Sequence, residues 1–315
     1  MNDTGERSAL FREAGLQVFE RGWLSSNNVL FTSAEAAYES VLVDTGYASH
    51  AAQTVALVRH ALGGVRQLDR VVNTHLHSDH CGGNHALQRT FGCAIDVPAG
   101  EAAKVDAWDE SALTYAATGQ ICPRFRRTGS VRAGDELKLA TMTWQVLAAP
   151  GHDPESVVLF QPDLCLLVSA DALWANGFGV VFPELVGEPG FDDVQRTLQL
   201  LASLPVRCVI PGHGAPFDDY EAALERAFKR LRGFAADPAK HARHAAKVLI
   251  KFRMLEIQSC ALDELDGWLT STAYLELARS RYFPATDPSA WHCDLLTDLV
   301  TAGALTFDGS LLRNV

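Results

Sequence analysis

The chemically most informative part of the sequence is residues 74–80, which read Thr-His-Leu-His-Ser-Asp-His. This segment places three imidazoles and one carboxylate, those of His75, His77, Asp79 and His80, within six residues. His75 and His77 alternate, so both side chains point to the same side of extended backbone. Such donors suit zinc, and also iron or manganese. Burying the cluster without a metal would be costly in desolvation, so we expect these residues to bind metal.

Three more polar residues follow predicted strands farther along the chain. His152 closes Ala-Pro-Gly-His, Asp171 closes Val-Ser-Ala-Asp, and His213 lies in Ile-Pro-Gly-His-Gly. Each would be a weak signal alone, because a histidine after a glycine is common in turns. With the first cluster they give five histidines and two aspartates. That set is large enough for two metal ions with one aspartate between them.

Short apolar runs precede these residues and predict the strands that position them. Each run has four to six apolar residues and ends at Gly, Pro, Asp or His, which is typical of a buried strand. We predict strands within residues 39–46, 68–75, 143–152, 163–171 and 206–213. Helical patterns lie between them at residues 51–64, 84–92 and 191–204. The chain therefore has an α/β or α+β fold in which helices cover the faces of the sheet.

The order of these motifs resembles the metallo-β-lactamase superfamily of hydrolases. The pattern is HxHxDH, then GH, then an Asp at the end of a strand, then PGHG, over about residues 15–215. The resemblance implies a four-layered αβ/βα sandwich with the metals at one edge. It also implies that His75, His77 and His152 hold one metal, that Asp79, His80 and His213 hold the other, and that Asp171 bridges them.

The resemblance extends to the Val-Asp-Thr-Gly at residues 43–46. In the family the aspartate of this motif, here Asp44, supports the metal-binding loop without binding the metal itself. The implied cofactors are two Zn²⁺ ions, with iron or manganese as alternatives. The implied reaction is hydrolysis by a metal-bridging hydroxide, in which Asp79 is the catalytic residue that accepts the nucleophile's proton. The sequence contains no recognisable Ser-His-Asp or Cys-His nucleophile motif.

Several functions remain open on this fold. The spelling of the histidine motif is closest to the branch of hydroxyacylglutathione hydrolases (glyoxalase II), which predicts a small ester, thioester or lactone as substrate. Asp153-Pro154-Glu155 stands where that branch has Ser/Thr-Pro-Gly, so the substrate stays open. The first alternative is a phosphodiesterase or ribonuclease that binds nucleic acid through its C-terminal part. The second is a sulfur dioxygenase with a single iron.

The C-terminal part has a different pattern. Amphipathic helices are predicted at residues 221–232 and 239–258, followed by short helices and a hairpin with Asp308-Gly309 as a two-residue turn. We divide the chain into a catalytic domain, 1–232, and a small helical domain, 233–315. The second domain resembles the winged-helix extension of lactamase-like protein 2-type members.

Residues 226–253 hold nine Lys and Arg against one acid, Asp237. This segment is a solvated or partner-facing helix surface, or it binds an anionic substrate tail or RNA. Two aromatic residues, Trp174 and Phe178, follow Asp171 on a predicted loop above the metals, and we expect them to line the substrate pocket. His85, His241, His244 and Cys81 are expected not to bind metal.

Composition narrows the class of protein further. The chain has 315 residues, 48% of them hydrophobic, and a net charge of −11. This charge disfavours nucleic acid and anionic membranes as partners over most of the surface. No stretch approaches the ~20 apolar residues of a membrane span, and the first residues do not read as a secretory signal. Seven scattered cysteines without a CxxC motif indicate reduced thiols. We therefore expect a cytoplasmic enzyme with a small-molecule substrate, and a homodimer formed through its tail.

Overall fold

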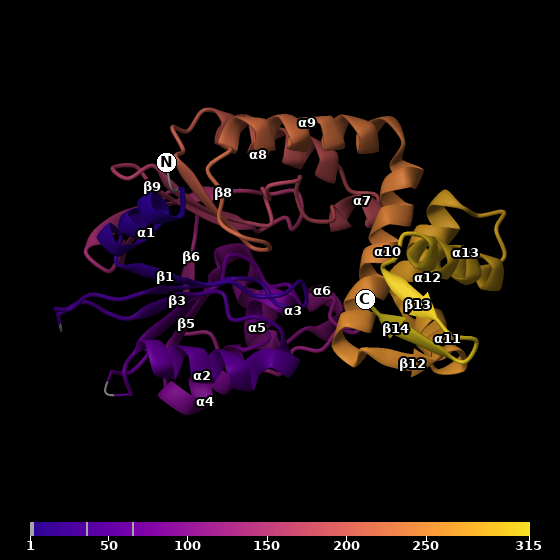
Figure 1. Cartoon of the computed structure of the whole chain (residues 1–315), viewed down its shortest axis with the longest axis horizontal. Helices are drawn as coiled ribbons and strands as arrows, with labels where there is room; N and C mark the ends of the chain where they lie inside the picture. The colour runs from indigo at the N-terminus through magenta and orange to yellow at the C-terminus, as the bar shows by residue number, and fades with distance from the viewer. Residues whose placement is uncertain (1–2, 36, 65) are drawn as a thin grey trace.

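The computed structural model describes residues 3–35, 37–64 and 66–315. It contains two β-sheets that pack face to face, with helices on both outer faces and a separate helical part at the C-terminus (Figure 1). This arrangement is the four-layered sandwich expected from the sequence. Within the described residues, no helix is both long and apolar enough to cross a membrane.

The first sheet has six strands in the order β1-β2-β3-β4-β5-β6. Strands β1, β2 and β3 pair antiparallel, and β3 to β6 pair parallel. The bounds are β1 Leu16–Phe19, β2 Asn28–Phe31, β3 Val41–Val43, β4 Arg70–Val72, β5 Ala94–Pro98 and β6 Gly129–Val131. The strands predicted at 39–46 and 68–75 are therefore β3 and β4, and each is shorter than predicted.

The second sheet has five strands in the order β11-β10-β9-β8-β7. Strands β10 and β11 pair parallel and the other neighbours pair antiparallel. The bounds are β7 Glu136–Leu139, β8 Met142–Ala148, β9 Val157–Gln161, β10 Leu166–Ala170 and β11 Cys208–Pro211. All residues of β9, β10 and β11 are buried, because both faces of this sheet are covered. Their continuous apolar runs follow from that burial.

Three apolar layers hold the sandwich together. The layer between the sheets includes Phe31 and Trp144, whose rings meet edge to face with centroids 5.1 Å apart. Helices α2 (Ala51–Ala61), α4 (Asn84–Phe91) and α5 (Ala102–Ala107) cover the outer face of the first sheet. Helices α8 (Gly190–Ala202) and α9 (Tyr220–Ala236) cover the second. Helices α2, α4 and α8 confirm the helical patterns predicted at residues 51–64, 84–92 and 191–204.

Four short helices complete the sandwich. Their bounds are α1 Asp3–Glu13, α3 Ser78–Cys81, α6 Glu110–Leu113 and α7 Phe182–Val186. Helix α3 follows β4 after a short loop and carries part of the histidine motif. Helix α7 lies between the sandwich and the C-terminal part.

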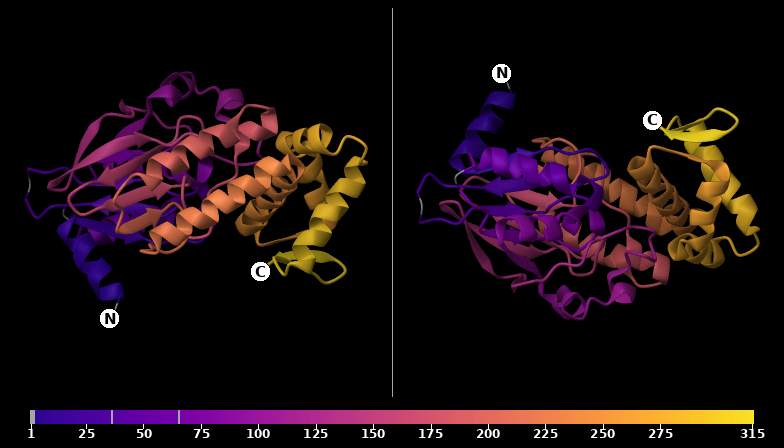
Figure 2. Two further views of the ribbon diagram at one scale, coloured as in Figure 1. Left: turned by 90° about the horizontal axis from the view of Figure 1, so that it is seen from above. Right: turned by 90° about the horizontal axis from the view of Figure 1, so that it is seen from below.

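The C-terminal part has its own apolar core beside one end of the sandwich (Figure 2). It contains α10 (Pro238–Ile257), β12 (Ser259–Ala261), α11 (Leu262–Ser271), α12 (Ala273–Tyr282), α13 (Pro288–Thr301), β13 (Leu305–Phe307) and β14 (Leu311–Asn314). The three strands form a small sheet in the order β12-β14-β13. Helices followed by a hairpin agree with the predicted pattern, and the winged-helix character stays a prediction.

Two details differ from the sequence prediction. The domain boundary placed between residues 232 and 233 lies inside α9, so the division into two domains remains a prediction. The hairpin connection contains three residues, 308–310, because β13 ends at Phe307 and β14 begins at Leu311. The carboxylate of Asp308 accepts hydrogen bonds from the backbone N–H groups of Ser310 and Leu311 at 3.0 and 2.9 Å. These bonds stabilise the wider turn.

Candidate metal centre

The seven predicted metal ligands meet at one edge of the sandwich. His75, His77, Asp79 and His80 follow β4 of the first sheet, in the loop before α3 and in α3 itself. The other three follow strands of the second sheet: His152 comes after β8, Asp171 after β10 and His213 after β11. The loops of both sheets therefore contribute to one site.

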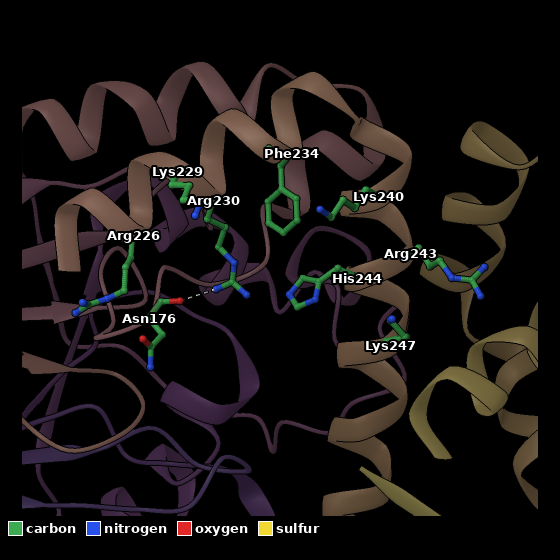
Figure 3. A pocket seen from close by; sticks show the side chains of 10 residues that line it. Asn176, Arg226, Lys229, Arg230, Phe234, Lys240, Arg243, His244 and Lys247 are labelled. Carbon is green, nitrogen blue, oxygen red and sulfur yellow. Dashed lines mark hydrogen bonds between the residues drawn. The ribbon is translucent and has the colours of Figure 1, made fainter. Parts of the chain in front are cut away.

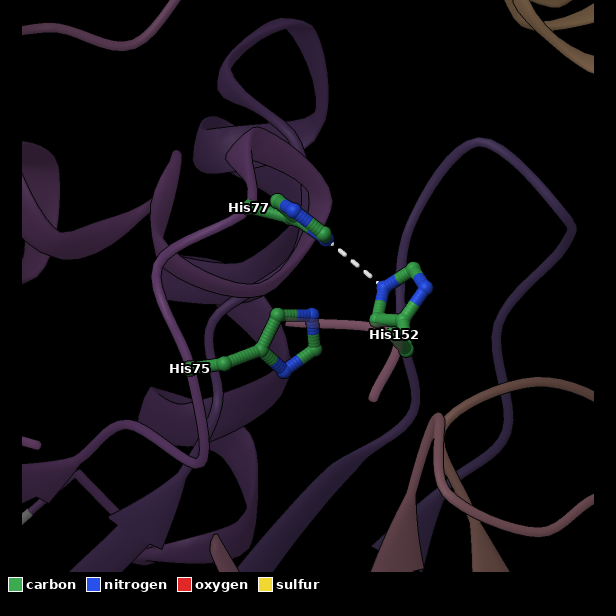
Figure 4. Close-up of side chains that lie close together, drawn as sticks. All are labelled: His75, His77 and His152. Atoms are coloured by element: carbon green, nitrogen blue, oxygen red, sulfur yellow. Dashed lines mark hydrogen bonds between the residues drawn. The ribbon is translucent and has the colours of Figure 1, made fainter. Parts of the chain in front are cut away.

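The first group consists of His75, His77 and His152. One nitrogen of each ring lies within 4.8 Å of the others. The rings turn toward a common point (Figure 4), and His77 Nδ1 is 2.7 Å from His152 Nε2. Two ring nitrogens can approach that closely only if at least one of them carries no proton. A bare nitrogen is what a metal ion requires.

The second group consists of Asp79, His80, Asp171 and His213, whose ligand atoms also lie within 4.8 Å of one another. His213 Nε2 is 3.0 Å from Asp79 Oδ2. Asp171 lies between the two groups, because its Oδ2 is 3.3 Å from His152 Nε2 and its Oδ1 is 3.4 Å from His80 Nε2. One carboxylate oxygen therefore faces each group.

Hydrogen bonds on the far side of the rings determine which nitrogens are bare. His80 Nδ1 donates to Asp44 Oδ2 at 2.7 Å, and His152 Nδ1 donates to the Val180 carbonyl oxygen at 2.5 Å. Both bonds hold the ring so that Nε2 is directed at the site, and in the neutral form of either ring this Nε2 is the nitrogen without a proton. Within the part of the chain that the structure describes, the buried Nε2 atoms of His75 and His80 have no hydrogen-bond partner. The residues therefore fit a divalent metal.

Asp44 connects the loop to these rings. Its carboxylate accepts hydrogen bonds from the backbone N–H of Thr74 at 2.9 Å and from the Thr74 hydroxyl at 2.7 Å. The same hydroxyl is 3.2 Å from His75 Nδ1. Asp44 is buried and has a φ of 56°, in the left-handed region that aspartate adopts more readily than most residue types. The observed contacts are those expected of a residue that orients the ligands.

Burial controls the protonation of the first group. Desolvation lowers the pKa of His75 well below its usual value, with a further contribution from His80. Desolvation also lowers the pKa values of His77 and His152 to about 4. The three imidazoles are therefore neutral near pH 7, and each has a lone pair available for a metal.

In the second group, the charges of neighbouring side chains outweigh the effect of burial on the pKa values. Burial lowers the pKa of His80, but the charges of Asp44 and Asp171 outweigh it and raise that pKa well above its usual value. Burial raises the pKa of Asp171, but attraction to His80 and His213 outweighs it, so the net shift is strongly downward. The carboxylates are therefore ionised, and the site carries the negative charge that suits a cation.

Aromatic rings surround the two groups. Trp174 lies beside His213, with centroids 5.4 Å apart, and its Nε1 donates to Asp171 Oδ1 at 3.2 Å. Trp23, which sequence reasoning missed, stacks on His213 with centroids 5.3 Å apart although its side chain is 57% exposed. Phe182 lies against His77, with centroids 5.0 Å apart.

Phe178 does not take the place expected of it. Its side chain is only 3% exposed and belongs to the apolar layer under α8 and α9. Its ring lies 6.5 Å from that of Phe234 and 6.0 Å from the Arg230 guanidinium. The expectation that Phe178 lines a pocket at the metals is wrong, because the loop after Trp174 turns its ring into the core.

The remaining histidines and Cys81 lie outside both groups, as expected. His85 Nδ1 is 2.6 Å from the Arg124 carbonyl oxygen, and His241 Nε2 accepts from the Val181 backbone N–H at 3.2 Å. The Cys81 thiol contacts the Tyr115 hydroxyl at 3.2 Å. Burial raises the pKa of Cys81 well above its usual value, so this thiol is un-ionised.

The motifs that build this site match a known family model. The model, described as the metallo-beta-lactamase superfamily, matches residues 21–213. The chain belongs to this superfamily. The matched residues include all seven candidate ligands.

The curated relatives carry the name hydroxyacylglutathione hydrolase. The protein from Hyphomonas neptunium is 34% identical over 141 residues, which are 45% of this chain and 47% of that protein. The protein from Brucella anthropi is 28% identical over 226 residues, or 71% of this chain and 68% of that protein. The chain thus spans about half the length of the first curated relatives it matches, and about two thirds of the Brucella protein.

A solved structure shares the fold over nearly the whole chain. It is a metallo-beta-lactamase family protein from Thermus thermophilus, with 20% identity and a TM-score of 0.55. The match covers 96% of this chain and 99% of that protein. The metallo-β-lactamase sandwich with a C-terminal helical part is therefore a known architecture.

Proposed function

We propose that this protein is a dinuclear metal-dependent hydrolase that cleaves a small ester, thioester or lactone. The observation that carries the proposal is the pair of ligand groups joined by Asp171, which presents one oxygen to each. Two groups that share a carboxylate suit two metal ions a short distance apart. The name of the curated relatives, hydroxyacylglutathione hydrolase, favours a thioester within this class.

Each residue has a role in the proposal. His75, His77 and His152 would hold one ion, Asp79, His80 and His213 the other, and Asp171 both. Zinc is the first choice because imidazole and carboxylate ligands suit it, with iron or manganese as alternatives. When bound, such ions lower the pKa of water at the site and polarise the carbonyl that is attacked.

Asp79 is the proposed proton acceptor. Its side chain is 13% exposed, more than those of His80, Asp171 and His213 in the same group. Its Oδ2 faces His213 Nε2, so the carboxylate reaches the interior of the site and solvent at once. That position suits a group that takes a proton from the attacking water and releases it.

Aromatic side chains shape the access to the site. Trp23 and Trp174 meet edge to face with centroids 5.4 Å apart, and both contact His213. On the other side Phe182 contacts His77 and also Tyr274 of the C-terminal part, with centroids 5.0 and 5.8 Å away. We infer that the acyl part of the substrate lies between these aromatic walls, where water is excluded.

The nucleic-acid alternative has less support. Two of the cations assigned to RNA binding, Arg243 and Lys247, both pair with Asp298, at 2.9 and 3.1 Å. A carboxylate that neutralises them would compete with a phosphate backbone. The ligand set for a second metal, in turn, favours hydrolysis over a dioxygenase with one iron. A cytoplasmic location, a small-molecule partner and a homodimer remain predictions from the sequence.

Metal content and turnover test the proposal together. Elemental analysis of protein purified without chelators should give about two zinc, manganese or iron ions per chain. The variants Asp171→Ala and His75→Ala should lose turnover of a thioester, ester and lactone panel while keeping the native circular dichroism spectrum. His85→Ala is the matched control, because His85 lies outside both groups.

Two results would contradict the hydrolase. One is unchanged turnover in either folded ligand variant. The other is about one iron per chain with oxygen-dependent activity on a sulfur compound.

A further inference from the structure

A strongly basic hollow lies in the elbow between α9 and α10, away from the ligand groups. Its volume is about 670 Å³, which is in the range of small-molecule sites. Figure 3 shows side chains from both helices directed into it. Six of the lining residues are Lys or Arg: Arg226, Lys229, Arg230, Lys240, Arg243 and Lys247.

These positive charges are only partly compensated. Arg226 pairs with Asp219 at 3.1 Å, and Arg243 and Lys247 share the single carboxylate of Asp298. Asp294 also acts on Arg243, so three carboxylates against six cations leave a surplus of three positive charges. None of the described residues that line the hollow is an Asp or Glu. In a chain with a net charge of −11, such a local surplus favours binding of an anion.

Two lysines are available to a ligand. Lys229 comes from α9 and Lys240 from the first turns of α10, so they approach the hollow from both arms of the elbow (Figure 3). Within residues 3–35, 37–64 and 66–315, neither ammonium group takes part in a salt bridge or hydrogen bond. Each can therefore donate to a phosphate oxygen without first breaking an internal contact.

Arg230 is already held in place at the floor of the hollow. Its Nη1 donates to the carbonyl oxygens of Asn176 at 3.2 Å and Phe178 at 3.4 Å, and its guanidinium lies 5.7 Å from the Phe234 ring centroid. The His244 ring stacks on the other side of this arrangement, 5.6 Å from Phe234. A fixed guanidinium loses little conformational entropy when it binds an anion.

We propose that this hollow binds a small molecule that carries two linked phosphate groups. A diphosphate carries about three negative charges near neutral pH, since a terminal phosphate has its second pKa near 6, and this comes close to the surplus. A single phosphate carries at most about two negative charges and would leave part of the surplus uncompensated. A nucleic-acid strand needs an open track of cations along its backbone, whereas these cations line one hollow between two helices.

One loop contacts both the hollow and the metal centre. Arg230 packs directly against Gly177, and the ring of His152 packs against Gly179 two residues later. Neither glycine has room for a side chain. Asn176 lines the hollow, so an anion there would lie beside the loop that presents Trp174 to His213. The proposal concerns a second site and does not depend on the hydrolase activity.

Proton NMR of His244 tests this site in the metal-loaded protein. The probe is inorganic pyrophosphate, and the signal of His244 is assigned with the variant His244→Gln. Because His244 lines the hollow, its signal reports binding there and not at the metals. We expect saturable shifts, and an apparent Kd at least tenfold higher in Lys229→Gln/Lys240→Gln. The control Arg132→Gln/Lys138→Gln removes one charge just after β6 and one in β7. Neither residue lines the hollow, so this variant should leave the Kd unchanged.

Several outcomes would overturn the proposal. One is a His244 signal that does not move at millimolar pyrophosphate. Another is an equal Kd in the wild type and in Lys229→Gln/Lys240→Gln. Signals that move only for the histidines of the metal centre would also overturn it. So would shifts produced by an RNA oligonucleotide and not by pyrophosphate. Turnover plays no part in this readout, so failure of the hydrolase assay would leave the result unaffected.

Discussion

Replacing Asp44 by asparagine removes one charge from beneath the metal centre at almost constant volume. In the wild type, Asp44 Oδ2 accepts from both the Thr74 hydroxyl and His80 Nδ1, while Oδ1 accepts from the Thr74 backbone N–H. An asparagine that keeps the backbone bond places its NH₂ group where Oδ2 was. A donor then faces the Nδ1–H of His80, so the His80 proton must move to Nε2 or the ring must rotate.

Either change affects the atom that faces the metal. Loss of a carboxylate partner behind a ligand histidine lowers metal affinity by about 10–100-fold, or about 1.4–2.8 kcal/mol. The effect should fall on the group that contains His80. The group that contains His75 should change less, because Asp44 reaches His75 only through the Thr74 hydroxyl.

Competition with a chromophoric chelator measures both zinc affinities. We expect two binding events in the wild type and selective weakening of one of them in Asp44→Asn. Asp69→Asn is a matched control, since the Asp69 carboxylate also accepts a backbone and a hydroxyl hydrogen bond, both from Ser40, and lies outside both ligand groups. Two unchanged zinc affinities in a folded Asp44→Asn protein would refute the role of Asp44 in holding His80.

Three further predictions concern stability and the metal loop. Trp144→Ala should lower the free energy of unfolding in urea by about 3–5 kcal/mol, because the side chain is fully buried between the sheets. Trp144→Phe should cost less, since the indole N–H has no partner among the described residues, and an equal cost would contradict the packing argument. Burial lowers the pKa of His241 to about 3 and that of His244 to about 4. The unfolded chain takes up these protons near pH 6.5, so stability should fall between about pH 6.5 and 4, by up to about 1.4 kcal/mol per pH unit for each histidine. His241→Gln should flatten that pH profile, and an unchanged profile would exclude His241 as a contributor. Gly82→Ala should weaken zinc binding, because its Cβ would lie 2.5 Å from backbone atoms beside α3. Gly233→Ala, which meets nothing within 4 Å, should bind zinc normally, and equal affinities in the two variants would contradict the steric argument.

The positions of the metal ligands could be predicted because the signal is local. Residues 74–80 lie in one loop and one short helix, so their spacing alone brings His75, His77 and His80 close together. The other three candidate ligands each follow a strand of the second sheet, and strand ends of a sandwich collect at one edge. The bridging geometry of Asp171 could not be predicted from the residues, because it depends on the packing of two sheets.

Two of the strands that were not predicted are very short, whereas β9 is a buried run as long as the predicted β10 and could have been found. Three-residue β6 and four-residue β1 offer too few positions for a period of two to be visible. The two errors at the aromatic wall have another cause, because contacts between residues far apart in the chain leave no local sequence pattern. Trp23 is distant from His213 in the chain, and the orientation of Phe178 depends on a loop held by Arg230.

The composition of the two ligand groups has a consequence for folding. In each group, the members that precede residue 81 come from the first sheet, and those that follow residue 151 come from the second. Neither group is complete until the two sheets have docked, so the full set of donors for a metal ion forms only at a late step of folding. An ion held by either group would cross-link the halves of the sandwich, and its binding free energy would oppose their separation.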